Sequence, residues 1–209
     1  MNTIIKKVKL ITLLLFSLIF VGSTCRKDSS KPCPRGRYSF DVTTQLLNEK
    51  AFYYINDTIV INSIIPKTLT DAITNGAINY SNNLGIGGSI GFTRIDSINS
   101  TIEKAIESLV IITELGMTSI NSSKFLLVTY QEVAQNFLLR IKIVPKKIGS
   151  YYIGVNDMYC QGIIGKDCTN ANFSSKVIAN NKNLILLSNA QIASVDQYLT
   201  DRIYCFRVQ

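Results

Sequence analysis

Histidine and tryptophan are both absent from the 209-residue sequence, and only 17% of its residues are charged. Without histidine the chain cannot form a Ser-His-Asp or Cys-His nucleophilic system, an HExxH zinc site or an imidazole general base. The low charge, together with 46% hydrophobic residues, excludes an intrinsically disordered chain. Most hydrolase mechanisms are therefore excluded, and the composition predicts one packed domain.

One segment of the sequence matches the consensus of a catalytic motif. Residues 87–91 read Gly-Gly-Ser-Ile-Gly, which fits the G-x-S-x-G nucleophile elbow. Such an elbow needs a strand before it, a helix after it and a histidine later in the chain. The following residues, Phe92 to Arg94, are typical of extended chain. The segment is predicted to be a glycine-rich turn into a strand.

Paired carboxylates remain the catalytic alternative, because a glycosidase needs only two acidic side chains about 5 to 9.5 Å apart. The 14 Asp and Glu residues are few and scattered. Asp157, Asp167 and Asn170 are close enough in sequence to offer oxygen ligands to calcium, but they lack the spacing of a known calcium loop. A solvated loop is favoured there, and neither a metal nor a cofactor is predicted.

The N-terminus carries an export signal. Lys6, Lys7 and Lys9 precede an apolar run from Leu10 to Val21, and small residues follow up to Cys25. Twelve residues are too few to span a bilayer, which requires about 20. Residues 1–24 are therefore predicted to be a cleavable signal peptide.

The end of this run, residues 21–25 (Val-Gly-Ser-Thr-Cys), resembles a bacterial lipobox. The resemblance implies that Cys25 becomes the acylated first residue of the mature protein, held at a membrane by its acyl chains, palmitate among them. Plain secretion, with Cys25 as a leftover thiol, is the alternative. Residues 25–36 are polar and are predicted to be the lipidated cysteine and its tether.

The excess of basic residues is modest. The formal net charge is +8, and without Lys6, Lys7 and Lys9 of the leader it becomes +5, because 19 basic and 14 acidic side chains remain. These basic residues are spread along the chain and do not cluster with aromatic residues. The sequence therefore favours a solvated surface and predicts no nucleic-acid partner.

Four cysteines follow Cys25 in the chain: Cys33, Cys160, Cys168 and Cys205. An even number in an exported chain predicts two disulfides. We expect Cys160 to pair with Cys168 across one loop and Cys33 to pair with Cys205, with Cys33 to Cys160 or Cys168 as the alternatives. A zinc site is disfavoured because the sequence has no Cys-x-x-Cys and no histidine.

From residue 37 onward, short runs of β-branched and aromatic residues alternate with Asn, Asp, Gly, Ser and Pro, which is typical of strands. One short helix is predicted from Thr101 to Ser108, where Ser100 and Glu103 fit a capping box; Leu109 to Thr113 fits helix or strand. Ile73 to Gly91 is predicted to be a long loop or insertion. The predicted strands are Tyr38–Thr44, Thr58–Ile64, Gly88–Arg94, Lys124–Tyr130, Phe137–Val144, Tyr151–Val155, Asn183–Leu187 and Arg202–Val208.

The segment from Pro145 to Tyr151 joins two of these strands through a turn that contains Pro and Gly. It resembles the corner of immunoglobulin-like sandwiches, in which a tyrosine hydroxyl bonds back to the chain. Ile153 stands where such domains carry a core cysteine. The sequence therefore predicts a mainly β fold, an immunoglobulin-like β-sandwich with one or two short helices, in a single domain over residues 37–209.

Tyrosine is the main candidate for ligand contacts, because its ring can stack on sugars or peptides. Most of the ten tyrosines are expected in the core or in cross-strand packing. Neighbouring tyrosines in a strand point to opposite faces, so one of each pair at most can serve a site. Those nearest to loops are Tyr53, Tyr54, Tyr80, Tyr151, Tyr152 and Tyr159.

Taken together, several features resemble the small uncharacterised lipoproteins of Bacteroidetes: Cys25 followed by Lys27-Asp28, residues 56–61 (Asn-Asp-Thr-Ile-Val-Ile), the Pro145–Tyr151 turn, and the closing residues 204–208 (Tyr-Cys-Phe-Arg-Val). This resemblance implies attachment to the outer membrane and no known activity. We expect a cell-envelope lipoprotein, monomeric or weakly associating, that binds a glycan or protein ligand. A His-free glycosidase and a purely structural envelope component are the alternatives.

Overall fold

The computed structural model describes residues 37–95, 102–122, 125–186 and 197–209. The predicted signal peptide, Cys25, Cys33 and the whole of the predicted tether, residues 25–36, lie outside these residues. Within the described part of the chain, no helix is long and apolar enough to cross a membrane. The described residues belong to one compact unit that extends from Arg35 to Gln209.

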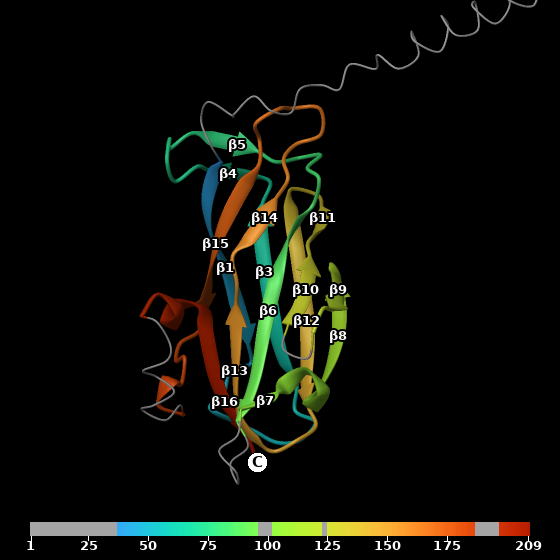
Figure 1. The fold of residues 1–209 in the computed structure, drawn as a ribbon, viewed down its shortest axis with the longest axis vertical. Coiled ribbons are helices and arrows are strands. Elements are labelled where there is room, and N and C mark those ends of the chain that lie inside the picture. Colours follow the sequence, from blue (N-terminus) through green and yellow to red (C-terminus); the bar gives the residue numbers. More distant parts are fainter. Residues whose placement is uncertain (1–36, 96–101, 123–124, 187–196) are drawn as a thin grey trace, which may run out of the picture. The chain divides into compact units, whose positions relative to one another are not determined.

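This unit is almost entirely β (Figure 1). Its helical segments, within the described ranges, are the short 3-10 turns η1 (Ala105–Ser108), η2 (Leu184–Leu186) and η3 (Gln197–Arg202). The strands are β1 (Tyr38–Leu47), β2 (Phe52–Tyr53), β3 (Ile59–Pro66), β4 (Thr68–Thr70), β5 (Ala77–Asn79), β6 (Ile86–Ile95), β7 (Ile102–Lys104), β8 (Leu109–Leu115), β9 (Met117–Ile120), β10 (Phe125–Thr129), β11 (Gln131–Val133), β12 (Asn136–Pro145), β13 (Gly149–Val155), β14 (Met158–Cys160), β15 (Ala171–Ile178) and β16 (Ile203–Val208).

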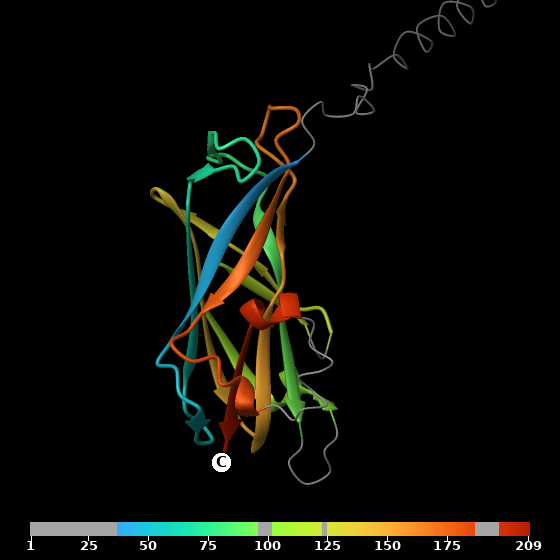
Figure 2. The ribbon, with the colours of Figure 1, turned by 90° about the vertical axis from the view of Figure 1, so that its left-hand side faces the viewer.

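The strands form two facing layers. The first layer has the order β8-β12-β3-β1-β15, and the second has the order β9-β10-β6-β13-β16-β2. β14 pairs with both β15 and β6, so it joins the layers along one side. In Figure 2, β3 lies at the left and β6 at the right, with the core between them. This is the predicted mainly β sandwich.

Every second side chain along the strands points inward, and these side chains fill the space between the layers. In β12, Phe137, Leu139, Ile141 and Ile143 are buried, while the residues between them are only half-buried on the outer side. Side chains of period two face one side of a sheet. Burying each such side chain contributes about 1.5 to 3 kcal/mol, so this face provides much of the driving force for folding.

The predicted tyrosine corner is confirmed. The Tyr151 hydroxyl donates a hydrogen bond to the Lys147 carbonyl oxygen at 2.7 Å. The Tyr151 ring is buried and stacks on Phe206 of β16, with centroids 5.1 Å apart. The hydroxyl therefore fixes the β12–β13 turn while the ring joins it to the core.

Most predicted strands are present, but four local expectations are wrong. The long loop or insertion expected over Ile73–Gly91 contains β5 and the beginning of β6. Residues 183–187 were expected as a strand, and the described part forms the 3-10 turn η2 instead. The helix expected up to Ser108 is replaced by β7 and the turn η1, and Leu109–Thr113 lies in a strand. β15 was not expected, although its residues alternate between buried and less buried positions.

Two predicted disulfides are not formed. Cys160 and Cys205 are both free and fully buried. Cys160 lies in the core between the layers, whereas Cys205 lies on the outer side of β16 in a separate cluster with Ile95 and Ile203. The two thiols therefore face different sides of a layer. Cys168 is disulfide-bonded, and its partner lies outside the described residues.

The Tyr151 hydroxyl bond predicts a measurable loss of stability. Tyr151→Phe leaves the Lys147 carbonyl without this donor, so we expect the free energy of unfolding to fall by about 1 to 2 kcal/mol. Urea denaturation followed by circular dichroism measures it. Tyr152→Phe is the matched control, because the Tyr152 hydroxyl has no hydrogen bond to described residues; an equal loss in both variants would contradict the corner.

The buried thiols predict protection from alkylation. Burial raises the pKa of Cys160 and raises that of Cys205 to about 12, which disfavours the reactive thiolate of both residues. Iodoacetamide should leave both unmodified in the native protein and label both after unfolding in guanidinium chloride. Peptide mass spectrometry identifies the labelled residues. Rapid native labelling of Cys205 would mean that the outer face of β16 is open.

Candidate functional site

Two glycines leave a hollow on the outer face of the second layer. Gly91 of β6 and Gly154 of β13 are directly opposite each other in the register of the two strands. Their neighbours Phe92 and Ile153 point into the core, so the glycine positions face outward. The hollow, here called the glycine groove, has a volume of about 270 Å³.

The backbone does not require glycine at either position. Neither Gly91 nor Gly154 has a positive φ, and a Cβ on Gly154 would meet the Ile203 Cγ2 atom at an ordinary 3.7 Å. A Cβ on Gly91 would lie 3.4 Å from the Phe125 ring. Larger residues therefore fit the strands, but they would occupy the groove. Glycine inside a strand is typical of a close approach by another group.

Apolar side chains form the walls of the groove. Phe125 stands at the start of β10 with 41% of its surface exposed, and Tyr152 and Ile203 line the other side. Tyr152 and Ile203 also pack in the outer cluster with Cys205, Leu184 and Leu186. This cluster holds two of the walls in place before any ligand binds.

The polar groups at one end of the groove already have partners. The Asn156 side-chain amide donates to the Ser89 hydroxyl at 2.8 Å. Arg202 forms an ion pair with Asp157 at 2.9 Å and lies 3.4 Å from the Ser174 hydroxyl. The guanidinium charge is therefore largely compensated, and the groove presents a mainly apolar surface with a polar end.

Exposed apolar side chains continue the surface beyond the groove. Leu127 lies two residues after Phe125 on the same face of β10 and is 41% exposed. On β9, Met117 is paired with Thr129 and is 67% exposed. Isolated apolar side chains are common on protein surfaces, but a row beside a groove indicates a place for a partner.

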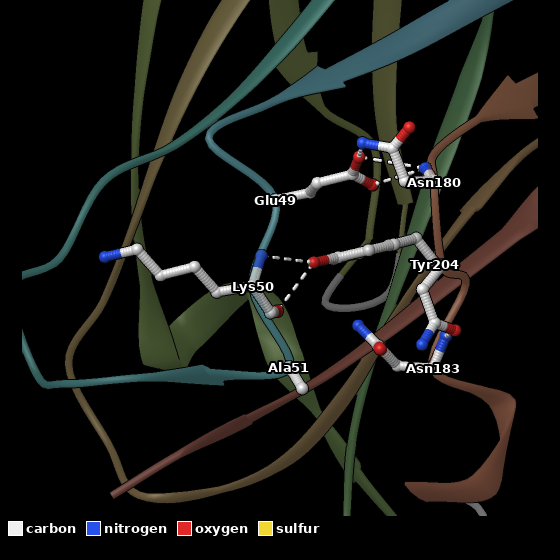
Figure 3. A pocket seen from close by; sticks show the side chains of 7 residues that line it. Glu49, Lys50, Ala51, Asn180, Asn183 and Tyr204 are labelled. Carbon is white, nitrogen blue, oxygen red and sulfur yellow. Dashed lines mark hydrogen bonds between the residues drawn. The ribbon is translucent and has the colours of Figure 1, made fainter.

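A second pocket, of about 300 Å³, lies where the loop after β1 meets the loop after β15 (Figure 3). The Tyr204 hydroxyl donates to the Lys50 carbonyl at 2.6 Å and accepts from its amide at 2.9 Å. Glu49 accepts from the Asn180 amide, and the Lys50 ammonium points away from the pocket. The other lining residues are Ala51, Asn181 and Asn183.

The hydrogen bonds of this pocket join the protein to itself. Burial raises the pKa of Tyr204 and of Tyr53, whose hydroxyl lies 3.4 Å from that of Tyr204, so both remain protonated donors. Asn183 donates its side-chain amide to the Cys205 carbonyl at 3.1 Å. The pocket is therefore a polar junction between two loops, and Glu49 is the one carboxylate among the described residues that line it.

The six tyrosines predicted near loops fall into a buried and an exposed group, as the alternation of side chains along a strand requires. Tyr53, Tyr80 and Tyr151 are buried, whereas Tyr54 is exposed and Tyr152 lines the groove. Tyr159 is partly exposed and carries the Arg37 guanidinium over its ring at 5.3 Å. One member of each adjacent pair faces outward, as expected. Tyr152 is the one that reaches the candidate site.

The other sequence motifs take structural roles. The Gly-Gly-Ser-Ile-Gly segment lies inside β6, paired on both sides, and is not a turn. Asp157 is occupied by Arg202, and the described residues contain no cluster of three His, Cys, Asp or Glu side chains that could hold a metal. Sequence reasoning missed the groove. The available signal was a glycine inside each of two predicted strands.

No protein-family model matches the chain, and no curated protein matches it. Solved structures with a similar arrangement include a non-cellulosomal cohesin from the archaeon Archaeoglobus fulgidus, with TM-score 0.35, 8% identity, and coverage of 80% of this chain and 91% of that one. A cohesin module of a Clostridium perfringens family 33 glycoside hydrolase gives TM-score 0.32, 9% identity, and coverage of 66% and 99%.

A type II cohesin domain from the cellulosome of Acetivibrio cellulolyticus gives TM-score 0.26, 9% identity, and coverage of 66% of this chain and 92% of that one. At these TM-scores the likeness carries no functional argument. What the groove can bind follows from this chain's own residues.

Proposed function

We propose that this protein is a cell-envelope lipoprotein whose β-sandwich binds a protein partner, and that the glycine groove receives one apolar side chain of that partner. The observation that carries the proposal is the facing pair Gly91 and Gly154 between the walls Phe125 and Tyr152. The groove offers a partner both a hollow and an aromatic contact.

The size and chemistry of the groove favour a side chain over a larger ligand. Its volume of about 270 Å³ is just below the range of about 300 to 1,000 Å³ typical of small-molecule sites. Asn156 and Arg202 are already engaged, so few polar groups remain to bind sugar hydroxyls. An aromatic or branched aliphatic side chain fills such a hollow and needs no hydrogen bond.

The surface around the groove also suits a protein partner, because it is apolar. Leu127 and Met117 extend the apolar contact from β10 to β9. A central apolar anchor in a pocket, surrounded by weaker contacts, is the usual arrangement of protein interfaces. A glycan would leave Leu127 and Met117 without a complementary group.

The glycosidase alternative has less support from the described pockets. A glycosidase needs two carboxyl groups flanking its substrate. Among the residues that the structure describes, none that lines the groove is a carboxylate, and only Glu49 is one in the second pocket. Both arrangements support binding as the proposed role.

The envelope address is part of the same proposal and rests on the sequence. An acylated Cys25 precedes β1, which begins at Tyr38, by a tether of about a dozen residues. Extended at about 3.3 to 3.6 Å per residue, such a tether reaches at most roughly 40 Å. The domain would therefore remain close to the membrane surface, where it meets partners of the envelope.

The groove is tested with a small aromatic probe. Phenylalanine amide should shift the backbone amide resonances of Gly91, Gly154 and Phe125 in two-dimensional NMR spectra of the protein. Gly154→Val should weaken this binding at least about tenfold, because its side chain fills the hollow without straining the backbone. A methyl glycoside, as the carbohydrate probe, should cause no shifts at these residues.

Thr43→Val is the matched control, because Thr43 is exposed on the outer face of the first layer and takes a side chain of the same size. It should bind phenylalanine amide like the unmodified protein. Shifts that persist in Gly154→Val, or that map away from the groove, would refute the site.

The lipid anchor is tested by mass. The protein extracted with detergent from native membranes should have Cys25 as its first residue and carry the added mass of acyl chains. Cys25→Ala should release the protein from the membrane fraction. A chain that retains residues 1–24, or that starts at Cys25 without acyl mass, would disprove the anchor and leave the groove proposal standing.

A further inference from the structure

One side of the sandwich is a continuous open edge. Within the described chain, β8 pairs only with β12 and β9 only with β10, and the chain passes from the first layer to the second at Gly116. Figure 1 shows both strands at the right-hand margin of the sheets. Their outward backbone groups face no other described strand.

Part of this edge is protected against pairing with a strand of another molecule. Natural sheets block exposed edges with charges, prolines or bulges. At Glu114 the register shifts, opposite Arg140 and Ile141 of β12, and the carboxylate forms an ion pair with Lys142 at 2.5 Å. Glu114 therefore combines a bulge with a charge, and at Gly116 the chain turns away into the other layer.

The segment Leu109–Thr113 has none of these protections. It contains no charged residue and no proline, and its register with β12 is regular. Val110 is 41% exposed and Ile112 is 47% exposed, both on the outer face of the first layer. A flat, apolar and unprotected edge is a template for another strand.

The segment is complementary to itself. In an antiparallel pair centred on Ile111, Val110 of one copy lies directly opposite Ile112 of the other, on the same face. All of Leu109–Thr113 finds a partner in this register, and Glu114 stays outside it. Directly opposed β-branched side chains are a favourable cross-strand pair.

We propose that two copies of this chain associate by antiparallel pairing of Leu109–Thr113 across a two-fold axis at Ile111. The first layers of the two copies then form one continuous sheet. A two-fold axis places the same patch on both partners, as in most soluble homodimers. The segment's self-complementary pattern and lack of charge favour a second copy as the occupant.

Pairing of five residues buries less surface than the 1,200 to 2,000 Å² that is typical of stable complexes. The dimer is therefore weak and forms as the local concentration rises. The glycine groove lies on the outer face of the second layer, so this pairing leaves it free. The proposal thus stands independently of the groove's ligand.

Sedimentation of the full-length chain in detergent, over a wide concentration range, tests the dimer. The unmodified protein should change from monomer to dimer, and Ile112→Lys should weaken the association at least about tenfold. Ile64→Lys is the matched control, because Ile64 is 54% exposed on the same face but lies on β3, inside the layer. It should associate normally.

Cysteine pairs test the register. Mild oxidation of a mixture of Val110→Cys and Ile112→Cys chains should give a cross-linked dimer, whereas a mixture of Ile64→Cys and Ile112→Cys chains should not. A protein that stays monomeric at every concentration would overturn the proposal. A dimer that is unchanged by Ile112→Lys would also overturn it, because the contact would then lie elsewhere.

Discussion

The close approach of neighbouring strands to β6 is the constraint on which the rest of the structure depends. A Cβ on Gly87 would lie 2.8 Å from the Val128 carbonyl oxygen of β10, and one on Gly88 would lie 2.7 Å from the Met158 side chain of β14. A side chain at Gly88 would collide with β14, so the glycine there lets β14 pack against β6. The same run of glycines ends at Gly91, which opens the groove. One local composition therefore both joins the layers and leaves the hollow of the glycine groove open.

The glycines of β6 and β13 fall into two groups, those that packing requires and those that it does not. Gly87 and Gly88 are needed by packing, because no larger residue fits beside the Val128 carbonyl or the Met158 side chain. Gly91 and Gly154 are not forced by the backbone, and their small size leaves apolar area uncovered. A stable fold gains little from such a hollow, since filling it would bury more apolar surface. Folding stability alone therefore does not account for the hollow.

Much of the fold was predictable because its signals are local. Short stretches of sequence determine the alternation of buried side chains in β12 and the Pro145–Tyr151 corner, and both are confirmed. β15 was missed because one of its buried positions is Ser175, so the apolar alternation is interrupted in the middle of the strand. Asn183–Leu187 was predicted as a strand because it is a short apolar run. Leu184 and Leu186 are apolar because they pack on the outer cluster, which no local pattern reveals.

The cysteines and the groove show where sequence reasoning ends. An even number of cysteines suggested two bridges, but Cys160 is a free thiol buried in the core and Cys205 a free thiol buried in the outer cluster, surroundings that only the three-dimensional arrangement reveals. The groove arises from the register that brings Gly91 opposite Gly154. Register is set by pairing between distant segments. The sequence therefore shows one glycine in each of two strands, but it does not show that the two glycines are neighbours.

The position of β1 has a mechanical consequence. β1 is the first described strand; it pairs in parallel with β15 from Tyr38 to Gln45 and in antiparallel with β3. A pull on its N-terminal end, directed along the strand, loads these hydrogen bonds together in shear and does not peel them apart one by one. A domain held by its N-terminus while a partner pulls on its second layer would carry that load through its central strands. The resistance of the domain to such a pull is therefore expected to depend on the pairing of β1 with β15 and β3.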